Sequence, residues 1–106
     1  KLVAVALGTL GGAFLGNSIG QSLDRADRAY AKNAAVRAQS APIGEPVLWR
    51  NPKSGNYGNV TAIREGDNAV TGAYCREYQN SVTVGGKTEQ AYGTACRQPD
   101  GSWKIL

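Results

Sequence analysis

The chain has 106 residues, a length that suits one modest domain or one helix joined to a small β domain. It has two cysteines and no histidine, so Ser–His, Cys–His and His–metal chemistry are excluded, and we expect no enzyme, no metal site and no cofactor. The net charge is +4. Residues 40–106 hold seven basic and six acidic residues, so no basic stripe is available to bind nucleic acid.

The first segment of the chain is apolar and carries small residues at a spacing of four. Such residues stack on one side of a helix, and in a bilayer a strip of this kind lets two helices pack closely. We therefore predict a glycine-zipper membrane helix whose packing face is Ala4, Gly8, Gly12, Gly16 and Gly20. Its lipid- or partner-facing residues are then Leu2, Val3, Leu7, Leu10, Phe14 and Leu15. Two alternatives are a soluble helical hairpin packed on itself and a secretory signal. Since the chain starts at Lys1 inside this segment, we expect further sequence upstream.

The next segment is charged. No proline occurs before Pro42, and we expect the helix to continue through residues 1–39 with a polar juxtamembrane extension. An apolar stripe there contains Leu23, Ala26, Tyr30 and Ala34. The basic residues of this part suit either contact with anionic lipid headgroups or a solvated helical face. Residues 40–46, with two prolines and a glycine, are predicted to be a linker.

Residues 47–106 are predicted to form an antiparallel β domain, because β-favouring runs alternate with turn residues. The five expected strands are Val47–Arg50, Tyr57–Glu65, Ala69–Val84, Lys87–Arg97 and Ser102–Leu106. The predicted fold class is therefore α+β, with a long N-terminal glycine-zipper helix followed by a small five-stranded antiparallel meander or barrel-like domain. The candidate core residues are Val47, Trp49, Val60, Ile63, Tyr74, Tyr78, Tyr92, Trp103 and Ile105.

The two cysteines are placed by a hairpin turn. If Gly85 and Gly86 form a two-residue loop, Cys75 lies ten positions before the turn and Cys96 ten positions after it, so the two are opposite each other. The alternation of pairs puts them at a non-hydrogen-bonded position, where Cα atoms are about 4.5 Å apart. That separation is within the disulfide range. We predict a Cys75–Cys96 disulfide and an oxidising compartment; the alternative is a pair of reduced thiols.

Several segments together carry a family resemblance; they are Ser22–Arg28, Cys75–Gln79, Val84–Lys87, Ala91–Gln98 and Pro99–Trp103. They resemble the 17 kDa surface antigen family of bacterial outer-membrane lipoproteins, in which a glycine-zipper, two-transmembrane-type segment precedes a small β domain. The lipidated cysteine and the first glycine-rich helix of that family are not in this chain. If both lie upstream, the resemblance implies a lipid anchor and an inserted helical hairpin; if they do not, membrane anchoring rests on one glycine-rich helix that needs partners. The resemblance implies a location at the bacterial outer membrane, with the β domain periplasmic or surface-exposed.

Two functional hypotheses follow. In the first, the protein is a non-enzymatic surface antigen and envelope scaffold, whose zipper packs into homo-oligomers or around outer-membrane proteins and contacts membrane lipid. In the second, the β domain is a membrane-anchored binding module for peptidoglycan, lipopolysaccharide or a host protein. The possible ligand platform of that module is formed by Tyr57, Tyr78 and Tyr92.

Overall fold

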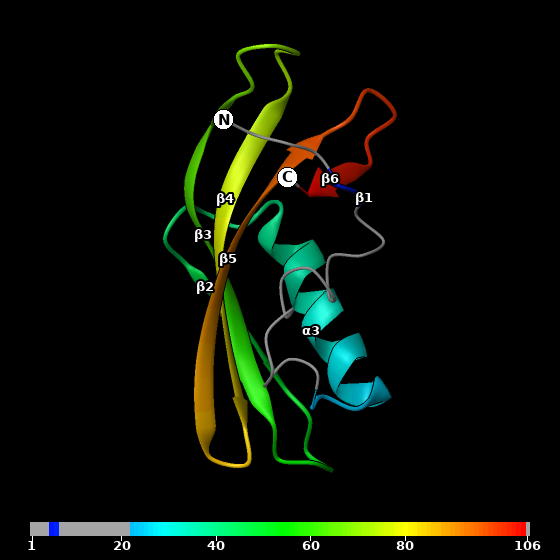
Figure 1. Cartoon of the computed structure of the whole chain (residues 1–106), viewed down its shortest axis with the longest axis vertical. Coiled ribbons are helices and arrows are strands. Elements are labelled where there is room, and N and C mark those ends of the chain that lie inside the picture. Colours follow the sequence, from blue (N-terminus) through cyan, green and yellow to red (C-terminus); the bar gives the residue numbers. More distant parts are fainter. Residues whose placement is uncertain (1–4, 7–21, 106) are drawn as a thin grey trace.

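The computed structural model describes residues 5–6 and 22–105 of the chain. These residues form an antiparallel sheet with the strand order β1-β6-β5-β4-β3-β2 and one helix packed against it (Figure 1). The elements are β1 (Val5–Ala6), α3 (Arg25–Ala38), β2 (Pro46–Arg50), β3 (Tyr57–Asp67), β4 (Tyr74–Val84), β5 (Lys87–Arg97) and β6 (Trp103–Ile105).

The predicted long N-terminal helix is wrong. The helix that the structure describes, α3, has 14 residues, and Val5–Ala6 form a strand paired with β6. Within the described residues, no helix has the length and apolar character needed to cross a bilayer. The absence of proline was a poor guide, because a helix also needs a start signal, and that signal lies at residue 24. The domain division into 1–39, 40–46 and 47–106 stays a prediction.

The start of α3 is fixed by a reciprocal cap. The Asp24 carboxylate accepts a hydrogen bond from the backbone N–H of Asp27, and the Asp27 carboxylate accepts one from the backbone N–H of Asp24. The buried side of the helix consists of Asp27, Ala31, Ala34, Ala35 and Ala38. The predicted stripe is half confirmed: Leu23 and Ala34 are buried, whereas Ala26 and Tyr30 are exposed, Tyr30 at 43%. Small alanines on the buried side bring the helix axis close to the sheet.

The five strands predicted after residue 46 are present as a meander, and β1 adds a sixth strand at the edge beside β6. The β4–β5 turn is the expected one: Gly85 and Gly86 both have positive φ, at 57° and 83°, as this two-residue turn requires. The strand predicted from Ala69 starts later, at Tyr74. A turn that is closed by a hydrogen bond from Asn68 N to Ala73 O, 2.8 Å long, occupies residues 68–73.

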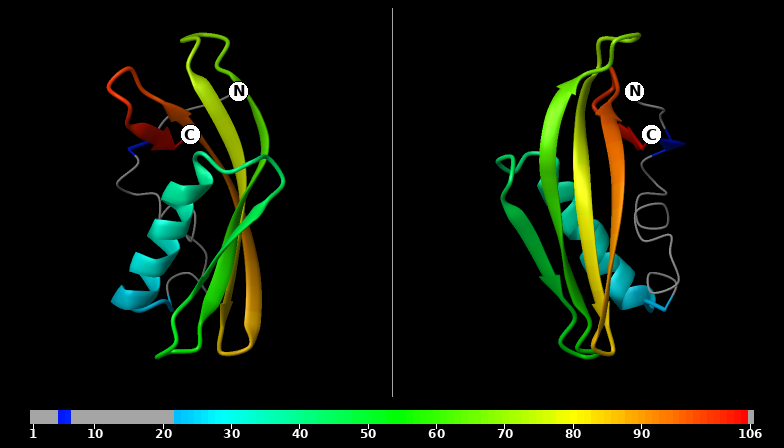
Figure 2. Two further views of the ribbon diagram at one scale, coloured as in Figure 1. Left: turned by 180° about the vertical axis from the view of Figure 1, so that it is seen from behind. Right: turned by 60° about the vertical axis from the view of Figure 1, so that its left-hand side comes forward.

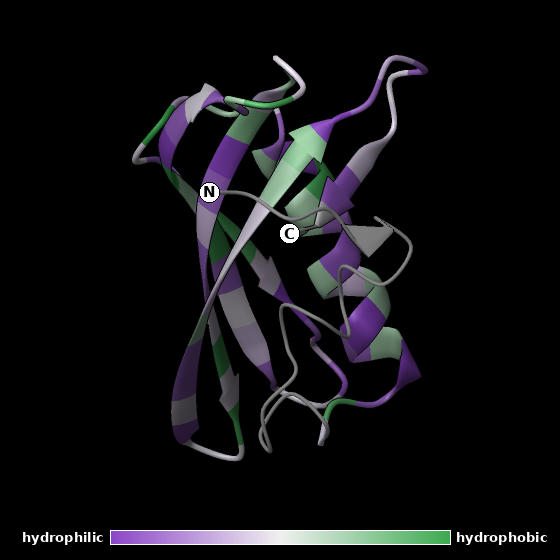
Figure 3. Cartoon of the chain, turned by 45° about the horizontal axis from the view of Figure 1, so that its top comes forward, coloured by the Kyte–Doolittle hydropathy of each residue, from purple (hydrophilic) through white to green (hydrophobic). Residues whose placement is uncertain are grey.

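The core lies between α3 and one face of the sheet, here called the inner face, and it includes Trp49, Val60, Tyr78 and Trp103. Polar and apolar residues follow one another along the strands (Figure 3), as a sheet with one covered face requires. Two core predictions were wrong. Ile63 is 40% exposed, because a register shift between residues 62 and 64 interrupts the alternation of the strand, and Tyr92 is 66% exposed on the opposite face. The other predicted core side chains that the structure describes, Val47 and Tyr74, belong to or pack against this cluster.

Candidate functional site

The face of the sheet opposite α3 is covered by no described element (Figure 2). Since successive strand residues point to opposite faces, Leu48 lies opposite the buried Val47 and Trp49. Pairing across the sheet then brings three rows of residues to this face. The rows are Pro46, Thr61, Gln79 and Tyr92; Leu48, Asn59, Ser81 and Gln90; and Arg50, Tyr57, Thr83 and Thr88. We call these twelve residues the outer face.

The outer face is rich in uncharged hydrogen-bonding groups. Arg50 is its one charged residue and stands on the edge strand β2. Neighbouring side chains contact one another: Gln79 Nε2 donates to Tyr92 Oη at 3.3 Å, and the hydroxyls of Thr83 and Thr88 are 2.8 Å apart. Thr83 is only 6% exposed, so it is the one buried residue of the outer face. A surface of this kind suits a neutral, hydroxyl-rich partner, because its side chains can exchange hydrogen bonds with hydroxyls and only Arg50, at the edge, carries a charge that contact would strip of water.

The three predicted platform tyrosines separate into two groups. Tyr57 and Tyr92 are 50% and 66% exposed and belong to the outer face. Tyr78 is 2% exposed on the inner face, where burial raises the pKa of its hydroxyl, so it is a core residue and no part of a platform. Leu48, 67% exposed, and Tyr57 both line a surface hollow of about 440 Å³ at the β2 edge.

A salt bridge borders the outer face. Arg64 donates two hydrogen bonds to the Glu77 carboxylate, at 2.9 and 2.6 Å, and these hold the pKa of Glu77 below its usual value. The two charges neutralise each other, and the pair is exposed to solvent. The pair therefore adds no net charge beside the outer face.

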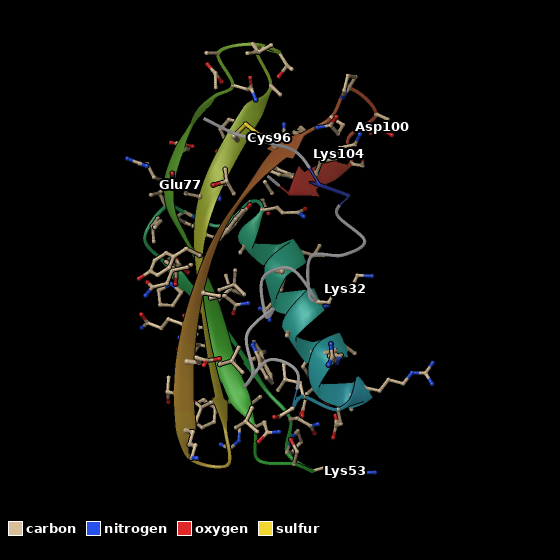
Figure 4. The ribbon with its side chains drawn as sticks, in the orientation of Figure 1. Lys32, Lys53, Glu77, Cys96, Asp100 and Lys104 are labelled. Carbon is tan, nitrogen blue, oxygen red and sulfur yellow. A yellow bond between two sulfur atoms is a disulfide. The ribbon has the colours of Figure 1, made fainter. Side chains whose placement is uncertain are left out.

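The predicted disulfide is confirmed. Cys75 and Cys96 are directly opposite in the β4–β5 pairing and are bonded to each other, with their Cα atoms 4.0 Å apart (Figure 4). Both cysteines are 2% exposed. The alternative of two reduced thiols does not describe this structure. The bond ties one end of β4 to the facing end of β5, and these two strands carry half of the outer face.

Asp27 was missed as a key residue by sequence analysis. Its side chain is fully buried, and its carboxylate accepts hydrogen bonds from Asn51 Nδ2, Ser54 Oγ and Asn56 Nδ2 at 2.7, 2.7 and 2.8 Å. Burial alone would raise the pKa of Asp27, but these three bonds and the one from the Asp24 backbone outweigh it and lower the pKa. The carboxylate thus fixes the β2–β3 loop, which leads directly into Tyr57.

The remaining predicted site residues lie outside the described residues. These are the packing series Ala4, Gly8, Gly12, Gly16 and Gly20, and the lipid- or partner-facing set Leu2, Val3, Leu7, Leu10, Phe14 and Leu15. Their predicted roles stay predictions.

A small antiparallel sheet with one face packed on a helix is a two-layer α+β architecture. Residues 37–104 match the family model described as 17 kDa outer membrane surface antigen. The 17 kDa surface antigen of Rickettsia bellii is 53% identical over 107 residues, which cover 100% of this chain and 67% of the relative. Those of Rickettsia conorii and Rickettsia prowazekii are 51% and 48% identical, over 79% and 78% of this chain and 53% and 52% of their own length. No solved structure matches the chain.

The chain belongs to the 17 kDa surface antigen family. The predicted resemblance is therefore confirmed, and membership in this family indicates a location at the cell surface or outer membrane. The chain spans about two thirds of the Rickettsia bellii relative and about half of the other two.

Proposed function

We propose that this protein is a non-enzymatic binding module of the bacterial outer membrane, and that its outer face binds the neutral glycan strands of the cell envelope. The observation that carries the proposal is the combination of uncharged hydrogen-bonding rows with two exposed tyrosines, Tyr57 and Tyr92. No histidine is present in the sequence to serve as a general base or metal ligand, which supports a role in binding over one in catalysis.

The chemistry of a glycan matches the two kinds of group on this face. Sugar rings have C–H faces that pack on aromatic rings, and they carry hydroxyls that both donate and accept hydrogen bonds. Asparagine, glutamine, serine and threonine side chains do the same, and they alternate with the tyrosines over three adjacent strands. Because Gln79 donates to the Tyr92 hydroxyl, the ring is held in place before a ligand arrives, which lowers the entropic cost of binding.

The test is co-sedimentation of the purified chain with isolated peptidoglycan. We expect the protein to pellet with it, and Tyr92→Ala and Tyr57→Ala to reduce the bound fraction several-fold. The matched control is Tyr30→Ala, because Tyr30 is exposed to a similar degree but lies on α3, away from the outer face. Equal pelleting of all four proteins, or no pelleting of the unmodified chain, would refute the proposal.

A second candidate function is that of an envelope scaffold, supported by the glycine-rich, apolar composition of the segment that contains Gly8, Gly12, Gly16 and Gly20. Positions without side chains allow close approach of a second copy or of an outer-membrane protein, and the apolar residues between them suit contact with lipid. A lipid anchor upstream would be part of this role. We expect Gly12→Leu to reduce the mass of the complex extracted in mild detergent without changing the circular dichroism of the β domain. An unchanged mass would exclude this role for the glycines.

A further inference from the structure

Two loops at one end of the sheet enclose a hollow that is separate from the outer face. One loop is residues 68–73 between β3 and β4, and the other is residues 98–102 between β5 and β6; both lie at the same end of the molecule in Figure 1. The hollow has a volume of about 500 Å³. Its lining includes Asn68, Thr71, Tyr74, Arg97 and Gln98.

The Arg97 side chain is held at this hollow by aromatic rings. Its guanidinium carbon lies 5.4 Å from the centroid of the Tyr74 ring and 5.4 Å from that of Trp103. The two rings meet edge to face, with centroids 6.0 Å apart and an interplanar angle of 75°. Stacking against rings restricts the guanidinium plane but does not use its N–H groups as hydrogen-bond donors to oxygen.

The N–H groups of Arg97 remain available. Within residues 5–6 and 22–105, its guanidinium donates no hydrogen bond and forms no ion pair with a carboxylate. Two carboxylates at this end of the sheet accept hydrogen bonds from groups other than Arg97. Glu65 accepts a hydrogen bond from Tyr74 Oη at 2.5 Å, and Asp100, labelled in Figure 4, accepts from the backbone N–H and hydroxyl of Ser102 at 2.9 and 2.6 Å. Asp67, which is paired with Tyr74 at the end of β3, forms no ion pair with Arg97 among these residues either, so the positive charge of Arg97 has no counter-ion within salt-bridge distance.

A second guanidinium strengthens the positive potential. The guanidinium carbon of Arg76 lies 5.7 Å from the centroid of the same Tyr74 ring. Its Nη1 donates to the carbonyl oxygens of Ala38 and Ala41 at 2.9 and 2.6 Å, and its Nε donates to Tyr74 Oη at 2.7 Å. Arg76 is therefore fixed by these bonds, and Arg97 is the group that meets a ligand. Arg76 is buried, whereas Arg97 is exposed at the hollow.

We propose that this hollow binds an oxyanion, a phosphate or carboxylate group, with Arg97 as its bidentate donor. A guanidinium presents paired N–H groups in a planar fork that matches two oxygens of such a group, and a fork whose plane is already restricted loses less entropy on binding. The oxyanion has two possible sources, a small soluble molecule and the headgroup of an anionic lipid. The proposal is independent of glycan binding, because Arg97 belongs to no row of the outer face.

The experiment is an NMR titration of the full chain with inorganic phosphate and with acetate at constant ionic strength, observing the indole N–H signal of Trp103. We expect saturable shifts. Arg97→Gln removes the charge and the fork, and we expect it to weaken binding roughly tenfold or more, as loss of a charge-assisted bidentate contact does. Arg64→Gln is the matched control, because it removes an exposed arginine whose partner is Glu77, and its binding should equal that of the unmodified chain.

Co-sedimentation with vesicles then distinguishes the two sources. If phosphatidylglycerol vesicles retain the unmodified chain better than phosphatidylcholine vesicles do, and Arg97→Gln removes this difference, the ligand is a lipid headgroup; if only the soluble anions bind, it is a small molecule. Arg97→Lys keeps the charge without the planar fork, and this variant should bind several-fold more weakly than the unmodified chain. If Arg97→Gln does not fold, this comparison tests the bidentate contact in its place. The proposal is overturned if no probe gives saturable shifts, or if the Arg97 variants bind as the unmodified chain does.

Discussion

Replacing Asp27 tests how the helix and the sheet are held together. Asp27→Ala removes an acceptor that serves the buried Asn51 and the more exposed Ser54 and Asn56, together with half of the cap at Asp24. A buried donor left without an acceptor costs about 1–3 kcal/mol, while exposed donors regain water. Loss of a cap adds roughly 0.5–1 kcal/mol, so we expect a total of about 1.5–4 kcal/mol. That is a large part of the stability of a domain of this size.

Asp27→Asn gives a sharper version of the test, because it keeps the shape and removes the charge. The NH2 of the new amide would face groups that now donate hydrogen bonds to the carboxylate, so donor would meet donor. We therefore expect a destabilisation close to that of Asp27→Ala. The pKa of Asp27 is lowered in the folded protein, so the carboxylate stabilises the fold above its ordinary pKa of 3.8, and this contribution is lost as the pH falls from there through the lowered value. The difference in stability between the unmodified chain and Asp27→Asn should therefore shrink in acid.

Urea denaturation followed by circular dichroism at several pH values measures both effects. Asp24→Ser is the control, because it also removes an acidic charge at the helix start but keeps a good capping side chain. The reasoning would be refuted if Asp27→Asn unfolded at the same urea concentration as the unmodified chain, or if their difference did not depend on pH.

Three further predictions concern the packing of the sheet, each measured by urea denaturation. Replacing Cys75 and Cys96 together by alanine should cost about 3 kcal/mol, because the bond closes a loop with a sequence separation of 21; reduction of the unmodified chain should have a similar effect. Gly58→Ala should cost about 2 kcal/mol or more, since the added methyl would meet a backbone oxygen of β4 and an indole ring of β2. Arg76→Ala should cost about 2–3 kcal/mol through its lost hydrogen bonds to carbonyls at and just beyond the end of α3. Arg64→Ala, at an exposed salt bridge, should change stability little. A larger loss of stability in Arg64→Ala than in Arg76→Ala would contradict the structural role given to Arg76.

The features that sequence analysis predicted well depend on short-range geometry. The glycine pair at residues 85–86 determines the β4–β5 register, and the register in turn brings Cys75 opposite Cys96. The same local rules predicted the strands after residue 46, including the one that begins at Tyr57. They did not anticipate the register shift at Ile63, because a bulge depends on the partner strand as well as on the residue itself.

The features that were missed depend on contacts between distant segments. Asp24 and Asp27 have the three-residue spacing of a capping box, which is a local signal for the start of α3. The prediction of one long helix did not take this signal into account. The role of Asp27 as acceptor for residues 51–56 had no local signal, because it requires the helix to be docked on the sheet. The stacking of Arg97 on Tyr74 and Trp103 likewise joins three different strands.

The most direct test of the central claim is to map a neutral sugar ligand onto the full chain. We would titrate a soluble N-acetylglucosamine oligosaccharide into the labelled protein and follow the backbone and side-chain NMR signals. The account predicts saturable shifts concentrated in Tyr57, Gln79 and Tyr92 and their neighbours on the outer face, with none around Tyr30 on α3. Shifts confined to other surfaces, or no shifts at saturating sugar, would contradict it.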